Sequence, residues 1–405
     1  MFESIQTRGV DNLLSLMQTF RVDPRPHKVD LVVGVYKDEH GHVPIMRSVK
    51  EAEQRLVDGE NTKNYVGISG DADFCALVPD VLLGAAAKPI VERRMQSMQT
   101  PGGSGALKVA CDFLNTMEKG KRIWVSTPTW ANHIPVAKDA GLTVDHYPYF
   151  RPSDKGLDFA GMMDHLQANA RSGDVVLLHA CCHNPTGVDL SLEQWQTVTE
   201  LVMNRGLLPL VDCAYQGLAE GMEADASGLR HMADAVPEML IANSFSKNFG
   251  IYRERTGAIS VIAQSPAQLE QAKVGIETVI RSNYSMPPSH GARVVTTILS
   301  DPALCEDWQA ELSKIRARIT EMRHALQGKL HQRQVNLDTG FLTTQRGMFS
   351  YTGFSPEVVK RLKEDSAIYI AGDGRINIAG LCHANLEGVA DGMAAAIAAA
   401  RSADS

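Results

Sequence analysis

A lysine that lies among hydroxyl side chains, directly after an apolar segment, is the residue of this sequence best suited to chemistry. Lys247 follows Ser244 and Ser246, and residues 238–242 before them are apolar enough and short enough to form a buried strand. A lysine at the end of a buried strand can lose its proton and attack a carbonyl carbon, because burial disfavours the charged ammonium. The alternative is a solvated lysine near a turn, and these residues by themselves leave both interpretations open.

Short apolar segments alternate with helical segments between about residues 93 and 257, which predicts an α/β domain with a mostly parallel sheet. The expected strands lie at 122–125, 175–179, 208–211, 239–242 and 258–263. In open sheets of this kind, ligands bind beyond the carboxyl ends of the strands. The residues that directly follow each predicted strand are therefore the candidates for a binding site.

Three of these strand ends carry side chains suited to a flat, charged ligand. Trp130 could stack on an aromatic ring, although packing in a core is the commoner use of tryptophan. Asn184 precedes Pro185 in a turn that leaves its amide free. Asp212 ends an apolar strand, where a carboxylate is costly to bury unless it meets a cation or a protonated ring nitrogen.

A glycine-rich helix start and an arginine provide a candidate anion site. Residues 102–105 read Gly-Gly-Ser-Gly before a helical segment, and glycines let backbone amides and the helix dipole approach an anion. The run matches neither the dinucleotide nor the P-loop pattern, because it lacks the further glycine and the Gly-Lys-Ser/Thr that these require. Arg255 is close enough in sequence to share the anion with Ser244 and Ser246, and pairing with Glu254 is the alternative.

Composition argues against several classes of protein. The 405 residues carry a formal net charge of -7 and no block of basic residues, so nucleic acid is not an expected partner. Apolar runs are far shorter than the roughly 18 residues of a membrane span, and the first residues do not resemble a secretion signal, so we expect a cytoplasmic protein. Seven scattered cysteines, including the adjacent Cys181 and Cys182, predict reduced thiols and no metal site.

The ends of the chain predict a smaller α+β unit. Residues 31–37 are expected to form a strand interrupted by Gly34, which marks either a close backbone approach or a bulge. Residues 375–380 alternate like an exposed edge strand. Further helices are predicted at 11–20, 48–56, 307–332 and 355–365, and further strands at 347–351 and 368–370.

The order of these motifs resembles the class I aspartate and aromatic-amino-acid aminotransferases, a group of fold-type-I pyridoxal-phosphate enzymes. The resemblance runs from Gly34-Val35-Tyr36-Lys37-Asp38-Glu39 through Cys182-His183-Asn184-Pro185-Thr186-Gly187 and Ser246-Lys247-Asn248-Phe249-Gly250 to Gly374-Arg375. It implies an α/β fold whose large domain holds a mostly parallel, seven-stranded type of sheet, beside a smaller α+β domain. The expected large, cofactor-binding domain covers 41–314, and residues 1–40 with 315–405 form the arm and small domain.

The resemblance also implies roles around pyridoxal 5'-phosphate. Lys247 bonds covalently to the cofactor and then acts as general base, while Asp212 keeps the pyridine nitrogen protonated. Tyr215 and Asn184 donate to the phenolic oxygen, and Trp130 stacks on the ring. His133 supports Asp212. The phosphate is held by Gly103, Ser104, Ser244, Ser246 and Arg255, together with Tyr65 from a second subunit.

Substrate contacts follow from the same resemblance. Arg375 binds the α-carboxylate, with a backbone contact from Gly34 and with Trp130 and Asn184 nearby. Arg281, from the neighbouring subunit of a symmetric homodimer, pairs with the side-chain carboxylate of aspartate or glutamate. The implied reaction is a ping-pong transfer of an amino group to a 2-oxo acid, either 2-oxoglutarate or a smaller acid such as glyoxylate.

The sequence leaves the amino donor open. Residues 62–65 resemble aspartate-preferring relatives, whereas Val33 and residues 243–246 resemble aromatic-preferring ones. Asp373 stands near Arg375 where relatives commonly have a small hydroxyl residue. The alternatives are an aromatic-amino-acid aminotransferase, another pyridoxal-phosphate reaction such as that of a β-lyase or decarboxylase, and a catalytically silent binding protein.

Overall fold

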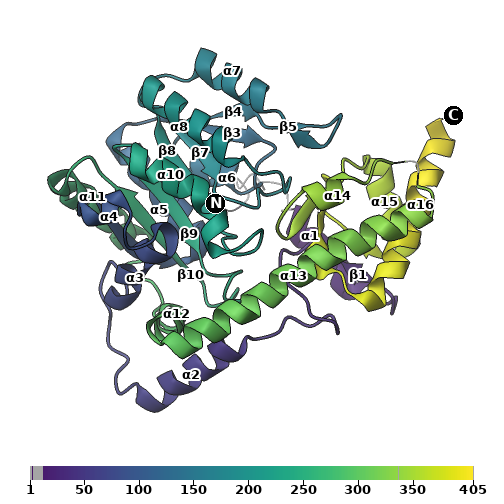
Figure 1. Ribbon diagram of the computed structural model, residues 1–405, viewed down its shortest axis with the longest axis horizontal. Coiled ribbons are helices and arrows are strands. Elements are labelled where there is room, and N and C mark those ends of the chain that lie inside the picture. The colour runs from purple at the N-terminus through teal and green to yellow at the C-terminus, as the bar shows by residue number, and fades with distance from the viewer. Residues whose placement is uncertain (1, 3–11, 336, 405) are drawn as a thin grey trace.

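The computed structural model describes residues 2, 12–335 and 337–404 and consists of a large α/β part and a smaller part (Figure 1). The predicted helix at 11–20 corresponds to α1 (Asn12–Val22), and residue 11 lies outside the described residues. The two parts are connected by one long helix, α13 (Pro302–Gln332).

The large part is built on a seven-stranded sheet with the strand order β2-β10-β9-β8-β7-β3-β4. Its strands are β2 (Met95–Pro101), β3 (Arg122–Thr127), β4 (Thr143–Pro148), β7 (Val175–His179), β8 (Leu208–Cys213), β9 (Met239–Ser244) and β10 (Thr256–Ile262). Only β10 runs antiparallel to its neighbours β9 and β2, and the five strands from β9 to β4 pair in parallel. The predicted mostly parallel sheet is thereby confirmed.

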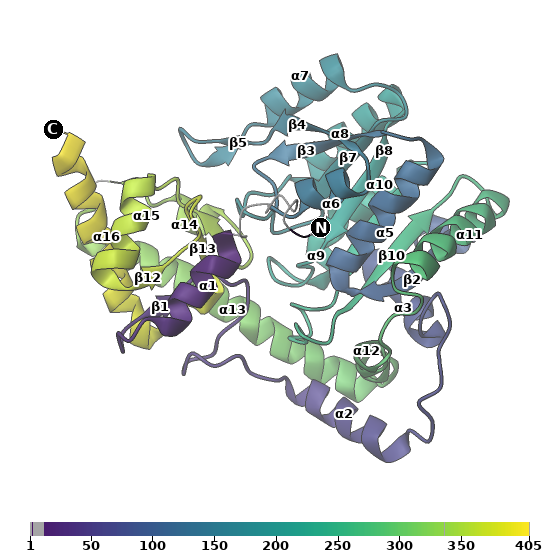
Figure 2. The same cartoon turned by 180° about the vertical axis from the view of Figure 1, so that it is seen from behind.

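Both faces of this sheet are covered by helices, which is why its central strands are apolar on both sides. In β7, Val175 and Leu177 point into one core and Val176 and Leu178 into the other. The first core is closed by α5 (Gly102–Met117), α6 (His133–Asp139) and α11 (Pro266–Asn283). The second is closed by α3 (Ala72–Leu83), α7 (Phe159–Asn169), α8 (Leu192–Arg205) and α10 (Ser227–Ala235), as Figure 2 shows from behind.

Helix α13 begins earlier than the predicted residue 307 because Asp301 caps it. The Asp301 carboxylate accepts hydrogen bonds from the amides of Ala303 and Leu304, and Pro302 occupies the first helical position. The helix packs on α2 (Arg47–Gly59) and α12 (His290–Ser300) at one end and on α16 (His383–Asp404) at the other. The predicted domain boundary at residue 314 falls inside α13 and stays a prediction.

The smaller part combines short strands with helices. Its elements are β1 (Val29–Asp30), α14 (Phe341–Thr344), β11 (Phe349–Tyr351), α15 (Pro356–Ser366), β12 (Ile368–Tyr369), β13 (Arg375–Asn377) and the 3-10 helix η2 (Ile378–Gly380). Strand β1 pairs in parallel with β12, and β11 pairs antiparallel with β13. The remaining short elements of the large part are α4 (Lys88–Val91), β5 (Phe150–Arg151), β6 (Gly156–Leu157) and α9 (Met222–Asp225).

One strand prediction in this part was wrong, and another was right only in part. Residues 31–37 are not a strand, although the Leu31 amide donates to the Tyr369 carbonyl at 2.9 Å and the Leu31 carbonyl accepts from the Asn377 amide at 2.8 Å. The Asn377 side chain instead donates to the carbonyls of Val33 and Val35. Residues 375–380 are buried rather than exposed, and β13 ends after three residues because the chain turns into η2. Within the described residues, no helix is long and apolar enough to cross a membrane.

Candidate active site

A cavity of about 200 Å³ lies where β8, β9 and β10 meet the smaller part. It is lined by Gly34, Gly103, Ser104, Leu107, Trp130, Asn184, Asp212, Ala214, Tyr215, Ser244, Ser246, Lys247, Tyr252, Arg255, Phe349 and Arg375. Most of the predicted site residues are in this group, because parallel strands end at the same edge of a sheet. Sequence reasoning missed Leu107, Ala214, Tyr252 and Phe349, which carry no charge; Ala214 directly follows β8, but an alanine there gives no sign of a binding role.

Asp212 lies at the end of β8 and is held by His133. The Nε2 atom of His133 is 3.1 Å from Asp212 Oδ2, and its Nδ1 atom is 2.8 Å from Thr129 Oγ1. Burial raises the pKa of Asp212, but the His133 hydrogen bond and the positive charge of Lys247 outweigh it, so the net pKa is lowered. Asp212 is therefore an ionised carboxylate in a buried place, able to hold a proton on a ligand.

Lys247 lies in the loop between β9 and β10, close to Asp212 and Tyr215. Its Nζ atom is 4.7 Å from the centre of the Tyr215 ring. Burial and the cation of Arg255 lower the pKa of Lys247 to about 8, while Asp212 opposes the shift. Much of the amine is consequently uncharged just above neutral pH, which is the state in which a lysine is a nucleophile or a base.

The amino end of α5 forms an anion cradle with β9 and Arg255. A Cβ atom on Gly102 would lie 2.5 Å from Arg255 Nη2, and one on Gly103 would lie 3.0 Å from Ser244 Cβ. Only glycines therefore let the start of α5 lie this close to Arg255 and Ser244. Backbone amides at a helix start, the hydroxyls of Ser104, Ser244 and Ser246, and a guanidinium together suit a phosphate group.

Arg375 is buried opposite the cradle, on β13. Its Nη1 donates to Asn184 Oδ1 at 3.1 Å and its Nη2 to the Val32 carbonyl at 3.0 Å, and the guanidinium stacks 4.3 Å from the Phe349 ring centre. The Nε atom is buried without a hydrogen-bond partner among the described residues. Burial lowers the pKa of Arg375, but the group stays a cation at neutral pH. A buried cation with an unused donor suits a carboxylate ligand.

Gly34 and Asn184 complete the wall beside Arg375. A Cβ atom on Gly34 would lie 2.6 Å from Phe349 Cζ, so the predicted close approach, rather than a bulge, explains this glycine. Asn184 donates through Nδ2 to the Tyr215 hydroxyl oxygen at 3.3 Å. Asp373 is exposed, and one of its carboxylate oxygens accepts from the Arg375 amide at 3.1 Å.

Tyr65 and Arg281 do not line this cavity. Tyr65 is 88% exposed, and Arg281 is also exposed and hydrogen-bonds to Ser285. The loop of Tyr65 touches the segment after α11, where the Val66 amide lies 3.2 Å from the sulfur of Met286. The fold thus brings the segments that carry the two residues into contact, and neither residue lines the chain's own cavity.

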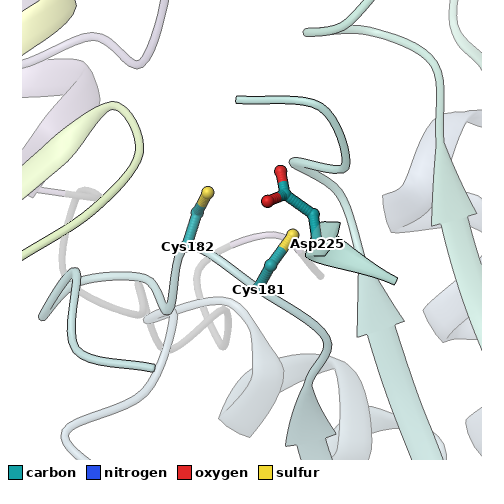
Figure 3. Close-up of side chains that lie close together, drawn as sticks. All are labelled: Cys181, Cys182 and Asp225. Carbon is teal, nitrogen blue, oxygen red and sulfur yellow. The ribbon is translucent and has the colours of Figure 1, made fainter. Parts of the chain in front are cut away.

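Cys181, Cys182 and Asp225 are the one group of described residues whose ligand atoms lie close enough together to hold a metal ion (Figure 3). Both oxygens of Asp225 already accept backbone amides. The hydrogen bond with Cys182 and burial hold the pKa of the Cys181 thiol well above its usual value. Because both Asp225 oxygens already accept backbone amides and both thiols are buried, this geometry favours a structural cluster.

Comparisons with known proteins agree with this geometry. Residues 26–393 match the family model of aminotransferase class I and II. The chain is 45% identical to the aspartate aminotransferase of Escherichia coli (strain K12), over 98% of this chain and 100% of that one. It is 47% identical to the aromatic-amino-acid aminotransferase of Pseudomonas aeruginosa, over 95% and 96% of the two chains.

A solved structure supports the cofactor. The aromatic-amino-acid aminotransferase from Burkholderia pseudomallei, covalently bound to pyridoxal phosphate, superposes with a TM-score of 0.95 at 40% identity and covers 98% of this chain and 99% of its own. The cradle, the ionised Asp212 and the deprotonatable Lys247 fit that cofactor. The chain therefore belongs to the class I and II aminotransferase family and is a pyridoxal-phosphate-dependent aminotransferase.

Proposed function

We propose that this enzyme moves the amino group of a dicarboxylic amino acid, most readily L-aspartate, to a 2-oxo acid such as 2-oxoglutarate. The observation that carries the proposal is the buried guanidinium of Arg375, whose Nε has no partner, in the same cavity as Lys247 and Asp212. A carboxylate bound there would be common to every amino acid and 2-oxo acid. A smaller acceptor such as glyoxylate has the same carboxylate and fits the same contact.

The residues that would hold the cofactor follow from the shape of the cavity. Gly103, Ser104, Ser244, Ser246 and Arg255 would bind its phosphate, and Trp130 would lie against its ring. Asp212, whose ionised form is stabilised by the hydrogen bond with His133, would hold a proton on the ring nitrogen. When bound, pyridoxal phosphate supplies an electron sink for the charge left on the Cα atom of the amino acid.

Lys247 and Arg375 would have separate roles, proton transfer for Lys247 and orientation of the substrate for Arg375. Lys247, with its lowered pKa, would take the proton from the Cα atom of the amino acid and return it at the C4′ carbon of the cofactor, as a general base and then a general acid. Arg375 would fix the α-carboxylate with two parallel hydrogen bonds, and so limit rotation of the Cα–H bond away from Lys247. Tyr215 and Asn184, which hydrogen-bond to one another, would bind the phenolic oxygen of the cofactor.

We further propose a homodimer in which each cavity is completed by the second subunit. Support comes from Tyr65 and Arg281, which are exposed and do not line the cavity of their own chain, and whose segments are in contact through Val66 and Met286. In a symmetric dimer, the same surface region of each subunit can contribute residues to the cavity of the other subunit. Arg281 would then bind the second carboxylate of the substrate, and Tyr65 the phosphate. The seven unpaired cysteines suit a reducing compartment, so we place the enzyme in the cytoplasm.

An aromatic amino donor is the second candidate. Trp130 and Phe349 give the cavity apolar walls, and the relative from Pseudomonas aeruginosa is named for aromatic amino acids. The two donors are separated by a half-reaction assay, in which aspartate, glutamate or phenylalanine is added to the holoenzyme and the visible band of the cofactor is followed. Faster loss of the band with aspartate, and its return with one 2-oxo acid, supports the proposal. Faster loss with phenylalanine favours the second candidate.

Replacement of Arg281 tests the dicarboxylate contact. In Arg281→Ala we expect kcat/KM for aspartate to fall about 100-fold, because a charged hydrogen bond contributes roughly 1.5–3 kcal/mol and each 1.4 kcal/mol is tenfold. For phenylalanine the change should stay within about threefold. Exposed Arg253→Ala is the matched control. Equal losses for both substrates would remove Arg281 from this role.

The rate at which the protein takes up the cofactor should depend on the fraction of Lys247 that is deprotonated. Because the pKa of Lys247 is about 8 rather than 10.5, the uncharged amine becomes the major form above pH 8. The rate at which cofactor-free protein regains the visible band should therefore rise between pH 6 and 8 and level off by about pH 9. Reaction of N-acetyl-lysine amide in the same buffers corrects for changes in the cofactor. A rate that still rises tenfold per pH unit at pH 9 would contradict the lowered pKa.

A further inference from the structure

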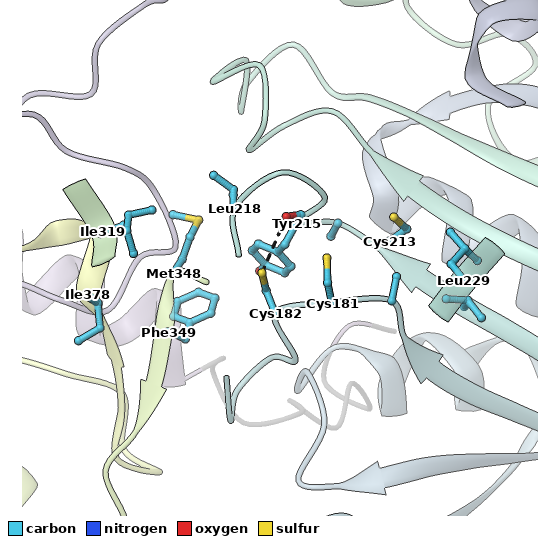
Figure 4. Close-up of a cluster of buried hydrophobic side chains, with 14 of the residues drawn as sticks. Cys181, Cys182, Cys213, Tyr215, Leu218, Leu229, Ile319, Met348, Phe349 and Ile378 are labelled. Carbon is cyan, nitrogen blue, oxygen red and sulfur yellow. Dashed lines mark hydrogen bonds between the residues drawn. The ribbon is translucent and has the colours of Figure 1, made fainter. Parts of the chain in front are cut away.

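The turn that leaves β8 carries Tyr215 and connects several parts of the cavity wall. The Leu218 amide donates to the Tyr215 carbonyl at 3.1 Å, which closes a turn with Gly217 at a φ of 95°. A Cβ atom on Gly217 would lie 2.6 Å from a methyl carbon of Leu312, so a side chain is excluded as well as strained. Figure 4 shows Tyr215 and Leu218 packed beside Met348 and Phe349 of the smaller part.

Asp225 binds the backbone of this turn and of the loop after it. Its Oδ2 accepts from the amides of Gly217 at 2.8 Å and Ala219 at 3.0 Å. Its Oδ1 accepts from Glu220 at 2.8 Å and Gly221 at 3.3 Å. Asp225 is only 7% exposed, and four backbone donors satisfy a carboxylate that would otherwise be costly to bury. This carboxylate therefore organises the loop rather than a ligand.

The same turn also reaches the lysine segment. Asn248, the residue after Lys247, donates through Nδ2 to the Gln216 carbonyl at 3.2 Å. The Gln216 side chain donates to the Val81 and Met222 carbonyls, both at 3.0 Å. A shift of the turn would therefore move Tyr215 and loosen the contact beside Lys247.

We propose that Asp225 is a positioning residue for the reaction: it holds the turn that aims the Tyr215 hydroxyl into the cavity. Asp225 does not line the cavity, so it would act through Tyr215 and not on the substrate. The inference rests on the proposed contact of Tyr215 with the phenolic oxygen of the cofactor. If the Tyr215 hydroxyl donates a hydrogen bond to the phenolic oxygen, it reduces the negative charge on that oxygen. The oxygen then attracts less strongly the proton on the Lys247 nitrogen that is bonded to the cofactor.

The test is a pH titration of the visible band of the holoenzyme in four forms: unchanged, Tyr215→Phe, Asp225→Asn and Glu223→Gln. Loss of the Tyr215 hydroxyl should move the midpoint up by about 1–2 pH units, since one charged hydrogen bond of roughly 1.5–3 kcal/mol corresponds to that shift. Asp225→Asn should move it the same way by about half as much. Glu223→Gln removes an equal charge two residues away, on an exposed side chain paired with Arg230, and should leave the midpoint unchanged.

A double variant and hydrogen exchange separate positioning from a general loss of structure. In a Tyr215→Phe background, Asp225→Asn should add no further shift of the midpoint, because both changes act through one hydroxyl. In cofactor-free protein, the amides of residues 217, 219, 220 and 221 should exchange at least about tenfold faster in Asp225→Asn than in Glu223→Gln, since asparagine offers these four donors only one acceptor oxygen, and that oxygen is uncharged.

The outcomes distinguish the two proposals. If Tyr215→Phe leaves the midpoint unchanged, the proposed role of Tyr215 fails. If Tyr215→Phe shifts it and Asp225→Asn does not, the positioning role of Asp225 is overturned while the role of Tyr215 survives. Should Asp225→Asn yield no folded holoenzyme, Asp225→Ser is judged by the same criteria. Rapid exchange of the four amides in the unchanged protein would also refute the inference.

Discussion

Lys247→Ala should abolish turnover and the imine absorbance of the bound cofactor. Without an amine at this position the variant lacks both the group proposed to bond covalently to the cofactor and the base proposed to take the Cα proton. We expect kcat to fall at least about 10⁴-fold, the upper range for loss of a positioned proton-transfer group. The measurement is the half-reaction with aspartate, followed by absorbance in a single turnover.

The control for this variant is Lys138→Ala, because Lys138 is an exposed lysine on α6. It should keep both the band and the activity. The cofactor should still bind to Lys247→Ala through the cradle, since the cradle residues are unchanged. Turnover within a factor of about 100 of the unchanged enzyme would defeat the assignment of Lys247, given the size of general acid–base effects.

Arg375→Lys should weaken every amino acid substrate to a similar degree. Lysine keeps the positive charge but loses the planar fork, so two parallel hydrogen bonds to the α-carboxylate become at most one. The contacts of Arg375 with Asn184 and the Val32 carbonyl are also lost or lengthened. We expect kcat/KM to fall about 100-fold or more for aspartate and for phenylalanine, from the loss of at least one charged hydrogen bond.

The comparison with Arg281→Ala makes this prediction specific. The two variants differ in pattern: Arg375→Lys should affect both donors, and Arg281→Ala only the dicarboxylic one. Arg361→Lys, on a half-exposed arginine of α15 that pairs with Glu357, is the matched control within the smaller part. A selective loss of aspartate activity in Arg375→Lys would mean that Arg375 binds the side chain of the substrate and not its α-carboxylate.

Local sequence predicted the sheet and the residues at its edge well. Strands β7, β8 and β9 begin with apolar residues because both faces of the sheet are covered. The polar residues that line the cavity lie at or after the carboxyl ends of these strands: Asp212 in β8, Ser244 in β9, and Asn184 in the loop after β7. The prediction failed at residues 31–37, and of residues 375–380 only 375–377 form a strand, which pairs with β11. Residues 31–37 read as an apolar strand, but the Val33 and Val35 carbonyls bond to the side chain of Asn377, more than 300 residues away, and the local sequence does not specify that contact.

The sequence by itself determined the large α/β part, the cofactor cradle and the positions of Asp212 and Lys247, because periodicity and glycine spacing are local signals. It also determined the family, through motifs that occur in one order along the chain. The roles assigned to single residues remain predictions, including Tyr65 and Arg281 in a second subunit.

Only the tertiary structure decided which distant segments close the site. Arg375 meets Val32 and Asn184, and Phe349 covers Gly34, across separations that leave no pattern in the sequence. The hydrogen bonds of Asp225 to the turn after Tyr215 are another contact that the sequence does not reveal, because an aspartate in a polar stretch looks like any surface acid. Such contacts depend on how helices and strands pack against one another, and the order of residue types along the sequence does not specify that packing.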